Sequence, residues 1–437
     1  MTHRTPSQLE FPGFQRRKVE ASFSGGHVTS DGGVLLLRAA DRRTGLMAAA
    51  ASALEDGRRA RSCRHSFVSM LRQRVYGLAQ GYEDLNDHDT LREDLALQTA
   101  VNRDEALASA PTLCRLENRA DRQTAWALHE VLVEQFIASH KCAPKELVLD
   151  FDATDDRVHG EQEGRFFHGY YDHYCFLPLY VFCGAQLLAA YLRPSKIDGA
   201  RHAGAILRLL VRRLRQVWPK VRIVFRGDSG FCRHWILGWC ERNSVDYIVG
   251  LARNTRLQAL SQQLSTRAAE HFAETGDKQR LFGEFAYAAA SWKRARRVIA
   301  KAEHTAHGAN PRYIVTNIKD DAQHLYDDLY CARGEMENRI KEQQLGLFAD
   351  RTSCHHWWAN QLRLLLASLA YTLMETIRRI GLRNTELARA QCTTLRLKLL
   401  KVGAVIIRNT RRVRFLLSSA CPYQDLFRTV ATRLNTS

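Results

Sequence analysis

The sequence lacks any apolar run long enough to cross a lipid bilayer. Its longest run, the eleven residues 364–374, is bounded by Arg363 and Glu375, whereas a spanning helix needs roughly 20 apolar residues. The first residues, MTHRTPSQLEFPGF, also lack the apolar core of a secretory signal. We therefore expect a cytoplasmic protein that does not enter the membrane.

Paired cysteines and nucleotide-binding glycine loops are also missing. The eleven cysteines occur singly, without any Cys-x-x-Cys spacing, which disfavours a zinc site or a disulfide framework and favours reduced thiols. Cys354, His355 and His356 are adjacent in the chain, and adjacent side chains on a helix or strand do not converge on one ion. Because no Gly-x-Gly-x-x-Gly loop or P-loop occurs, nucleotide hydrolysis is not supported.

Acidic residues are scarce relative to basic ones. The chain of 437 residues contains 64 Lys and Arg against 46 Asp and Glu, for a formal net charge of +18. Its sequence pI is near 9.6. Such an excess opposes compaction unless a polyanion neutralises part of it, and nucleic acid is the commonest polyanionic partner. The length is ample for two or three domains with sizeable cores.

The pattern of apolar and charged residues changes several times along the sequence. Ser30–Gly33 predict a turn and a helix start, and residues 47–140 repeat apolar residues at helical spacing with almost no proline. This basic helical region either binds DNA or only packs. The predicted regions are 1–140, mainly helical; 141–255, the first part of an α/β core; 256–328, a β-rich insertion that does not continue the core; 329–356, the last helix of the core; and 357–437, a basic helical region.

Residues 141–255 show strand and helix patterns in a definite order. ELVLDFDA predicts a strand, FLPLYVFCGAQLLAAYLRP a hairpin that turns near Gly184, and HAGAILRLLVRRLRQVW an amphipathic helix. VRIVFRGD, RHWILGWCERNSV and DYIVGLAR then predict a strand, a helix and a strand. This is the order of a ribonuclease-H-like α/β fold. It excludes a Rossmann domain, which needs a helix between its first two strands.

Isolated carboxylates stand at the ends of two of these strands. The strand period of two puts Asp150 and Asp152 on one face of the first strand. A buried face tolerates carboxylates only with a compensating charge, so this pair indicates a bound cation. Asp152 is the first candidate ligand because it ends the strand, and Asp150 is the alternative. Asp228 ends another apolar strand, and alone it could be a simple turn aspartate.

The most informative segment is YCARGEMENRIKE, which begins at Tyr330. On a helix, the spacing of Tyr330, Arg333 and Glu337 places a phenol, a guanidinium and a carboxylate along one face. This face could hold a metal through the carboxylate and a phosphate through the arginine. Three carboxylates suit two magnesium ions, which prefer oxygen ligands and lie about 3.5–4 Å apart in two-metal sites. We therefore expect metal-dependent phosphodiester chemistry on nucleic acid.

These motifs together resemble DDE-type bacterial insertion-sequence transposases, specifically the insertion sequence 1380 family. The resemblance runs from TSDGGVLLLR through LDFDATDD, RGDSGFC and RGEMENRIKE to the basic C-terminus. It implies that Asp152, Asp228 and Glu337 form a catalytic triad that binds Mg²⁺ or Mn²⁺. The long gap between Asp228 and Glu337 is similar to the β-strand insertion of related transposases.

One position departs from the related signature Tyr-x2-Arg-x3-Glu-x6-Lys. Tyr330, Arg333 and Glu337 match it, but Gln344 stands where the signature has lysine. Lys341, one helical turn after Glu337, could reach a DNA phosphate in its place.

The resemblance implies a transposase that binds the terminal inverted repeats of its element, cleaves there and joins the 3′ ends to target DNA. Synapsis of two ends implies a homodimer, in the bacterial cytoplasm at the nucleoid. The alternative is a domesticated or inactive DNA-binding protein, and the intact acidic positions favour the enzyme. Residues 357–437 contain 14 Lys and Arg against 3 Asp and Glu. There we predict phosphate contacts from Arg408, Arg411, Arg412 and Arg414.

Overall fold

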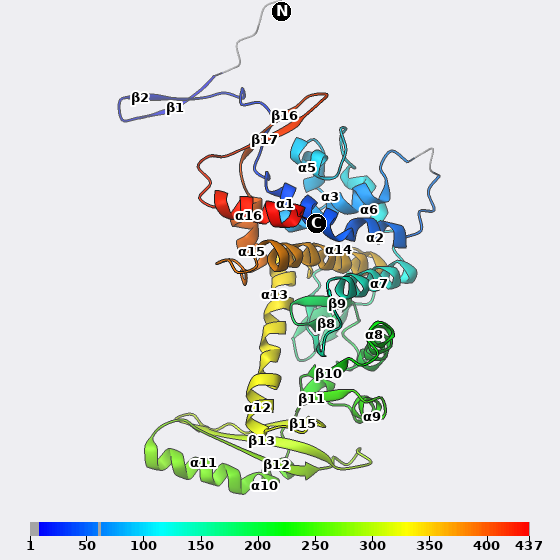
Figure 1. Ribbon diagram of the computed structural model, residues 1–437, viewed down its shortest axis with the longest axis vertical. Helices are drawn as coiled ribbons and strands as arrows, with labels where there is room; N and C mark the ends of the chain where they lie inside the picture. The colour runs from blue at the N-terminus through cyan, green and yellow to red at the C-terminus, as the bar shows by residue number, and fades with distance from the viewer. Residues whose placement is uncertain (1–7, 60–62, 437) are drawn as a thin grey trace, which may run out of the picture. The chain divides into compact units, whose positions relative to one another are not determined.

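The chain divides into two units, which are described separately. The computed structural model describes residues 8–59 and 63–436, so the first seven residues of the predicted N-terminal segment lie outside the described part. Unit 1 is Met1–Glu117 with Leu369–Ser437, and unit 2 is Asn118–Ser368. The division falls within helix α14 (Trp357–Thr376) (Figure 1). Among the described residues, no helix is long and apolar enough to cross a membrane.

Unit 1 is mainly helical, and two of its short sheets come from the ends of the sequence. The hairpin β1–β2 is exposed along both strands. Between α14 and α15, residues Ile377–Gly381 form a wide helical turn. The elements are β1 (Leu9–Phe14), β2 (Arg17–Ala21), β3 (Val28–Thr29), α1 (Val34–Thr44), α2 (Leu46–Ala53), α3 (Phe67–Gln80), α4 (Asp87–Leu91), α5 (Leu95–Ala100), α6 (Ala110–Glu117), α15 (Cys392–Leu395), β16 (Ala404–Arg408), β17 (Val413–Leu417) and α16 (Gln424–Asn435).

The TSDGG segment anchors the start of α1 to the C-terminal part of unit 1. Buried Asp31 pairs with Lys401 at 2.7 Å and accepts a hydrogen bond from the Tyr82 hydroxyl. The amide of Gly33 donates to the carbonyl oxygen of Leu400 at 3.1 Å. A Cβ atom on Gly33 would overlap this backbone. The predicted helix start at Val34 is therefore confirmed, and its glycine is required by close backbone approach.

The C-terminal arginines lie on a β-hairpin and not on the expected helix. Arg408 ends β16, Arg414 belongs to β17, and Arg411 and Arg412 form the turn between them. The side chain of Asn409 accepts hydrogen bonds from the amides of Arg411 and Arg412, which closes this turn. Strand β16 also pairs with β3. The β-branched residues Val405–Ile407 favour a strand, but the helical patterns of the flanking segments led to the prediction of a helix.

Unit 2 is built on a mixed sheet, which confirms the α/β class. In the described part of the chain this sheet has nine strands in the order β12-β13-β15-β11-β10-β4-β8-β9, with β14 paired to β13. Strands β4, β10 and β11 are parallel to one another, and their other neighbours are antiparallel. The strands are β4 (Glu146–Ala153), β8 (Leu179–Cys183), β9 (Gln186–Tyr191), β10 (Arg222–Gly227), β11 (Asp246–Leu251), β12 (Gln279–Tyr287), β13 (Arg296–Thr305), β14 (Gly308–Ala309) and β15 (Arg312–Thr316).

Helices cover both faces of this sheet (Figure 1). On one face, side chains such as Leu149, Phe225 and Val249 pack against α7 (Arg122–Ala138), α8 (Ala203–Val217) and α9 (His234–Arg242). On the other face, Val224 and Ile248 pack against residues 318–330. The alternation along β10 and β11 thus follows the strand period of two. The β8–β9 hairpin turns at Gly184, as the sequence predicted.

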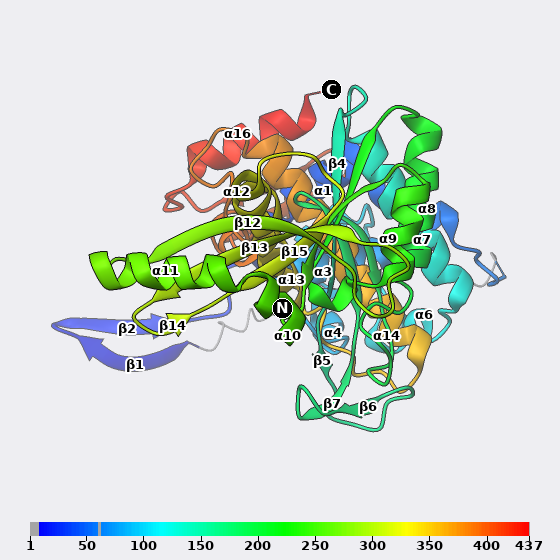
Figure 2. The same cartoon turned by 90° about the horizontal axis from the view of Figure 1, so that it is seen from below.

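The region after β11 joins the main sheet, contrary to the expectation that residues 256–328 do not continue the core. It begins with α10 (Thr255–Leu260) and α11 (Gln262–Thr275). The strands then return, and β15 pairs with β11, so β12 to β15 lengthen the core sheet (Figure 2). The sequence could not show this pairing, because strand patterns identify strands but not their distant neighbours.

Two further segments complete unit 2. Strands β5 (Asp156–Arg157), β6 (Phe166–His168) and β7 (His173–Phe176) form a small sheet that stands apart from the large one (Figure 2). From α12 (Ala322–His324) the chain stays helical through a wide turn, Leu325–Tyr330, and a tight turn, Cys331–Arg333, into α13 (Gly334–Leu347). Tyr330 and Arg333 therefore precede the regular helix that carries Glu337.

The crowding at Gly33 gives a prediction for unit 1. Gly33→Ala should destabilise the fold by about 1–3 kcal/mol, because the added methyl group overpacks the backbone of residues 399 and 400. The matched control is Gly57→Ala, where a Cβ atom would meet nothing within 4 Å. Thermal unfolding followed by circular dichroism should show a lowered midpoint for Gly33→Ala alone. Equal midpoints for the two variants would contradict this account of the TSDGG segment.

Candidate active site

The two aspartates of β4 have different environments. Asp150 is 2% exposed and lies directly opposite Arg226 of β10. The Arg226 guanidinium binds both of its oxygens, one at 2.6 Å, and also donates to the carbonyl oxygen of Leu329. Burial raises the pKa of Asp150, and Arg226 opposes that rise. Asp150 is thus committed to a buried ion pair, and its compensating charge is an arginine.

Asp152 lies at the end of β4, on the same face as Asp150. One of its oxygens accepts a hydrogen bond from the amide of Ala153 at 2.9 Å, and the other accepts from Arg333 at 3.1 Å. The pKa of Asp152 is raised to about 6, mainly by burial and also by the carboxylates of Asp228 and Glu337, against the opposing effect of Arg333. These electrostatic effects on Asp152 show that the three predicted carboxylates lie near one another.

Asp228 is held by the turn that follows β10. Its side chain accepts a hydrogen bond from the amide of Gly230 at 2.8 Å and begins the short turn Ser229–Phe231. Neighbouring strand β11 carries Gly250, where a Cβ atom would lie 2.6 Å from the hydroxyl of Tyr330 and 2.8 Å from the amide of Ser229. Sequence reasoning missed Gly250. A glycine inside an apolar strand is the signal that could have found it.

Arg333 stands at the centre of the group. Its guanidinium donates to Asp152 and, with its other terminal nitrogen, to Glu337 of α13. Burial works against its charge, but Asp152 and Glu337 outweigh burial and raise the pKa of Arg333. Burial likewise raises the pKa of Tyr330, with Arg333 and Asp228 as its charged neighbours. The structure thus gathers Tyr330 and the three carboxylates around the guanidinium of Arg333.

The donor chemistry of this group suits a hard divalent cation. Its ligands are carboxylate oxygens, and a cation would relieve the repulsion that helps to raise the pKa of Asp152. Within the described residues, however, no cluster of three His, Cys, Asp or Glu is arranged to hold a metal. Arg333 explains this arrangement, because it binds Asp152 and Glu337 itself. A cation bound by both carboxylates would compete with that guanidinium.

The remaining predicted residues lie outside this group. Lys341 is exposed on α13. The side chain of Gln344 donates to the carbonyl oxygen of Asp155 at 3.0 Å and to the carboxyl group of buried Asp156 at 2.8 Å. The residue at the signature's lysine position therefore anchors α13 to β5. Arg408, Arg411, Arg412 and Arg414 belong to unit 1.

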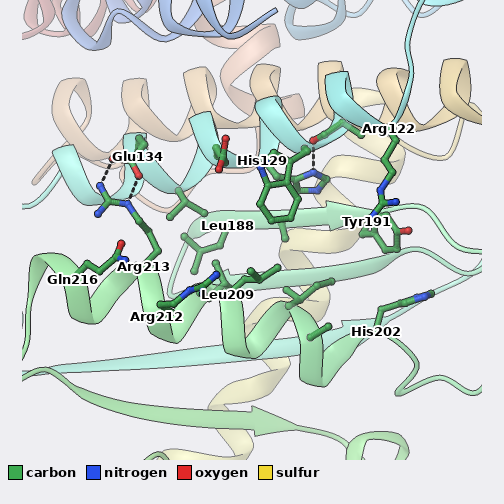
Figure 3. Close-up of a pocket in the computed structure, with 18 of the residues that line it drawn as sticks. Arg122, His129, Glu134, Leu188, Tyr191, His202, Leu209, Arg212, Arg213 and Gln216 are labelled. Atoms are coloured by element: carbon green, nitrogen blue, oxygen red, sulfur yellow. Dashed lines mark hydrogen bonds and ion pairs between the residues drawn. The ribbon is translucent and has the colours of Figure 1, made fainter.

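A cavity in unit 2 does not contain these residues. It has a volume of about 670 Å³ and is lined from α7, β9 and α8, by side chains such as Val133, Leu188 and Leu209 (Figure 3). The ring of half-buried His129 has Nδ1 at 2.7 Å from the Ala125 carbonyl oxygen and Nε2 at 3.1 Å from the Ala190 carbonyl oxygen. This cavity is lined mostly by apolar atoms, and none of the predicted site residues lines it.

Comparison with known proteins identifies the family of the chain. No curated protein sequence matches it. One similar solved structure is the piggyBac transposase in a synaptic complex with hairpin DNA, with a TM-score of 0.43 and 9% sequence identity over 85% of this chain and 80% of that one. Residues 11–437 match the family described as transposase DDE domain group 1. Because the match spans nearly the whole chain, this protein belongs to that family and is a DNA-cleaving transposase enzyme.

Proposed function

We propose that the chain is the transposase of an insertion sequence of the 1380 family. It binds the terminal inverted repeats of its element, cleaves the DNA there and transfers the 3′ ends to target DNA, as a homodimer that synapses both ends at the bacterial nucleoid. The observation that carries the proposal is the convergence of Asp152, Asp228 and Glu337 around Arg333.

The sheet supports a ribonuclease-H-like core. Strands β9, β8 and β4 form an antiparallel meander, and β10 and β11 continue from β4 in parallel. In such a sheet the carboxyl ends of β4 and β10 lie side by side, which places Asp152 beside the turn of Asp228. The region β12 to β15 then leads into the helix that delivers Glu337.

We assign metal binding to Asp152, Asp228 and Glu337, with two Mg²⁺ or Mn²⁺ ions as the cofactor. The bound ions would supply an activated water or 3′-hydroxyl and stabilise the leaving oxygen. Arg333 has a different role in this assignment. Its planar guanidinium, now paired with Asp152 and Glu337, binds the phosphate next to the scissile bond in a bidentate manner once the carboxylates take up cations. Tyr330 flanks that phosphate, and Lys341 contacts the DNA further along α13.

The three carboxylates give the direct test of the function. Asp152→Asn, Asp228→Asn and Glu337→Gln should each abolish Mg²⁺-dependent cleavage of duplexes taken from the DNA that flanks the coding sequence. Because each change removes a ligand charge and little surface, binding of these duplexes should persist. Gel assays of cleavage and of retardation measure the two quantities. Full cleavage by any of the three variants would remove that residue from the site.

Asp150→Asn serves as the comparison within the same strand. It leaves Arg226 buried without a counter-charge, so its main effect should be a lower thermal midpoint, because breaking a buried ion pair is strongly destabilising. At a temperature where it remains folded, it should retain more cleavage than Asp152→Asn. An inactive but stable Asp150→Asn together with an active Asp152→Asn would reverse the assignment of the first ligand.

Arg333→Lys tests the bidentate phosphate contact. Lysine keeps the charge but loses the planar fork, so we expect cleavage to slow by about tenfold or more, since a charge-assisted contact is worth roughly 1.5–3 kcal/mol. The control is Arg339→Lys, on the same helix, where Arg339 pairs with Glu342 at 3.2 Å. Single-turnover cleavage rates measure both. A wild-type rate for Arg333→Lys would show that this guanidinium serves only the fold.

The β16–β17 hairpin is the proposed DNA-binding surface of unit 1. Arg411, Arg412 and Arg414 are exposed, whereas Arg408 is half-buried and donates to the side chain of Gln98 and the carbonyl oxygen of Asp104. The first three are therefore placed to contact phosphates, and Arg408 mainly holds the hairpin to its neighbours. This distinction refines the predicted set of four arginines.

Salt dependence separates these two roles. Replacing Arg411, Arg412 and Arg414 together with alanine should flatten the plot of log binding constant against log salt by roughly 0.9 for each phosphate that the variant can no longer neutralise. Arg408→Ala should change the slope less and the thermal midpoint more. Fluorescence anisotropy with a labelled duplex at several salt concentrations gives the slopes. If the triple variant kept the wild-type slope, the phosphate-binding residues would lie elsewhere.

A further inference from the structure

The small sheet β5-β7-β6 exposes an unusual concentration of aromatic side chains. Tyr170 in the turn between β6 and β7 is 85% exposed, and Phe167 and Tyr174 are 53% and 46% exposed. Phe166 is 39% exposed. Aromatic rings left in water on a short hairpin cost free energy, because their apolar area gains nothing from burial. We call residues 166–174 the aromatic hairpin (Figure 2).

Cations accompany the rings on both faces of the aromatic hairpin. Phe167 and Tyr174 are paired across the strands in an edge-to-face arrangement, with ring centroids 5.7 Å apart. The guanidinium of Arg165, which also pairs with exposed Glu161, lies 4.6 Å from the centroid of Tyr174. On the other face, the ammonium group of Lys196 lies 5.6 Å from the centroid of Phe166. Rings flanked by cations suit a partner that has both flat faces and negative charge.

The aromatic hairpin is fastened next to the carboxylates. His173 binds the side chain of Asp155 at 2.8 Å, in the loop between β4 and β5. The Ser195 hydroxyl donates to the carbonyl oxygen of Phe166 at 2.8 Å. Tyr171 packs against His168 and Tyr170. Burial raises the pKa of Tyr171 to about 12, and Asp155 and Asp152 add to that rise. The turn of the hairpin thus lies within electrostatic reach of the proposed metal ligand Asp152.

We propose that the aromatic hairpin stacks on an unpaired base of the DNA beside the scissile phosphate, with Tyr170 and Phe167 as the stacking rings. The proposal rests on the proposed function of the neighbouring carboxylates. A paired base shows only its edges, so a ring can stack on a base only where the duplex is opened. The exposed rings, the flanking cations and the adjacent carboxylates favour nucleic acid over a protein partner. Stacking there would hold the strand open and fix the register of the cleaved bond.

The test compares DNA with and without unpaired bases. The probes are two labelled duplexes of one sequence, one fully paired and one with a run of unpaired thymines beside the cleavage position. Wild type should prefer the opened duplex, and a Tyr170→Ala, Phe167→Ala double variant should lose about tenfold of that preference, since each base–aromatic stack contributes roughly 1–3 kcal/mol. Tyr170→Trp should keep it. Trp126→Ala is the matched control, because Trp126 is an aromatic residue on α7 that is 51% exposed.

Cross-linking locates the contact independently. With 5-iodouracil in place of the unpaired thymines, irradiation and mass spectrometry should identify peptides of residues 166–174 in wild type and Trp126→Ala. An unchanged preference in the double variant, or cross-links confined to other segments, would overturn the proposal. A double variant that changes the oligomeric state but not the DNA preference would assign the rings to a protein interface. Absence of Mg²⁺-dependent cleavage by wild type would instead refute the proposed function, because base preference is measured without cleavage.

Discussion

The candidate active site depends on one guanidinium that holds together carboxylates from distant parts of the sequence. Three carboxylates at a partly buried position repel one another, and burial adds a desolvation cost for each charge. Arg333 offsets this by donating to Asp152 and Glu337, which links the end of β4 to α13. The raised pKa of Asp152 shows that the compensation is incomplete.

A second ion pair, between Asp150 and Arg226, lies on the same strand as the pair between Asp152 and Arg333. Asp150 and Arg226 are buried between β4 and β10, and Arg226 also reaches the carbonyl oxygen of Leu329. These contacts hold both strands and the approach to α13 without help from Asp152. The two aspartates on one face of β4 thus have different partners. Asp150 is paired with Arg226 inside the sheet, and Asp152 is paired with Arg333 at the strand end.

The sequence grouped the candidate site residues correctly in space but not all of the sheet around them. Strand period and strand ends located Asp152 and Asp228, and helical spacing grouped Tyr330, Arg333 and Glu337, since these are local properties of the chain. The pairing of Asp150 with Arg226 was not foreseen, because it depends on which strands become neighbours. For the same reason, the pairing of β15 with β11 was not predicted. The place of the triad residues in catalysis stays a prediction until the variants are measured.

The roles of several other residues became clear only from their tertiary contacts. The arginine-rich C-terminal segment was expected to be helical, but its β-branched residues form β16, which pairs with β17 and β3. Gly250 is unusual in an apolar strand, but only the structure shows the reason. Tyr330 and Ser229 pack so closely against it that a side chain would not fit. Gln344 likewise reveals its anchoring role only through the position of β5.

The pairing of β15 with β11 has a consequence for how this chain tolerates changes in length. Because β15 is paired with β11 on one side and with β13 on the other, the helical segment that follows it starts from a fixed place in the sheet. The turn at residues 306–308 joins β13 to β14, and Gly308 adopts a positive φ there. Insertions or foreign domains at this turn would leave Glu337 in step with Asp152 and Asp228, whereas a single residue added after β15 would rotate it away.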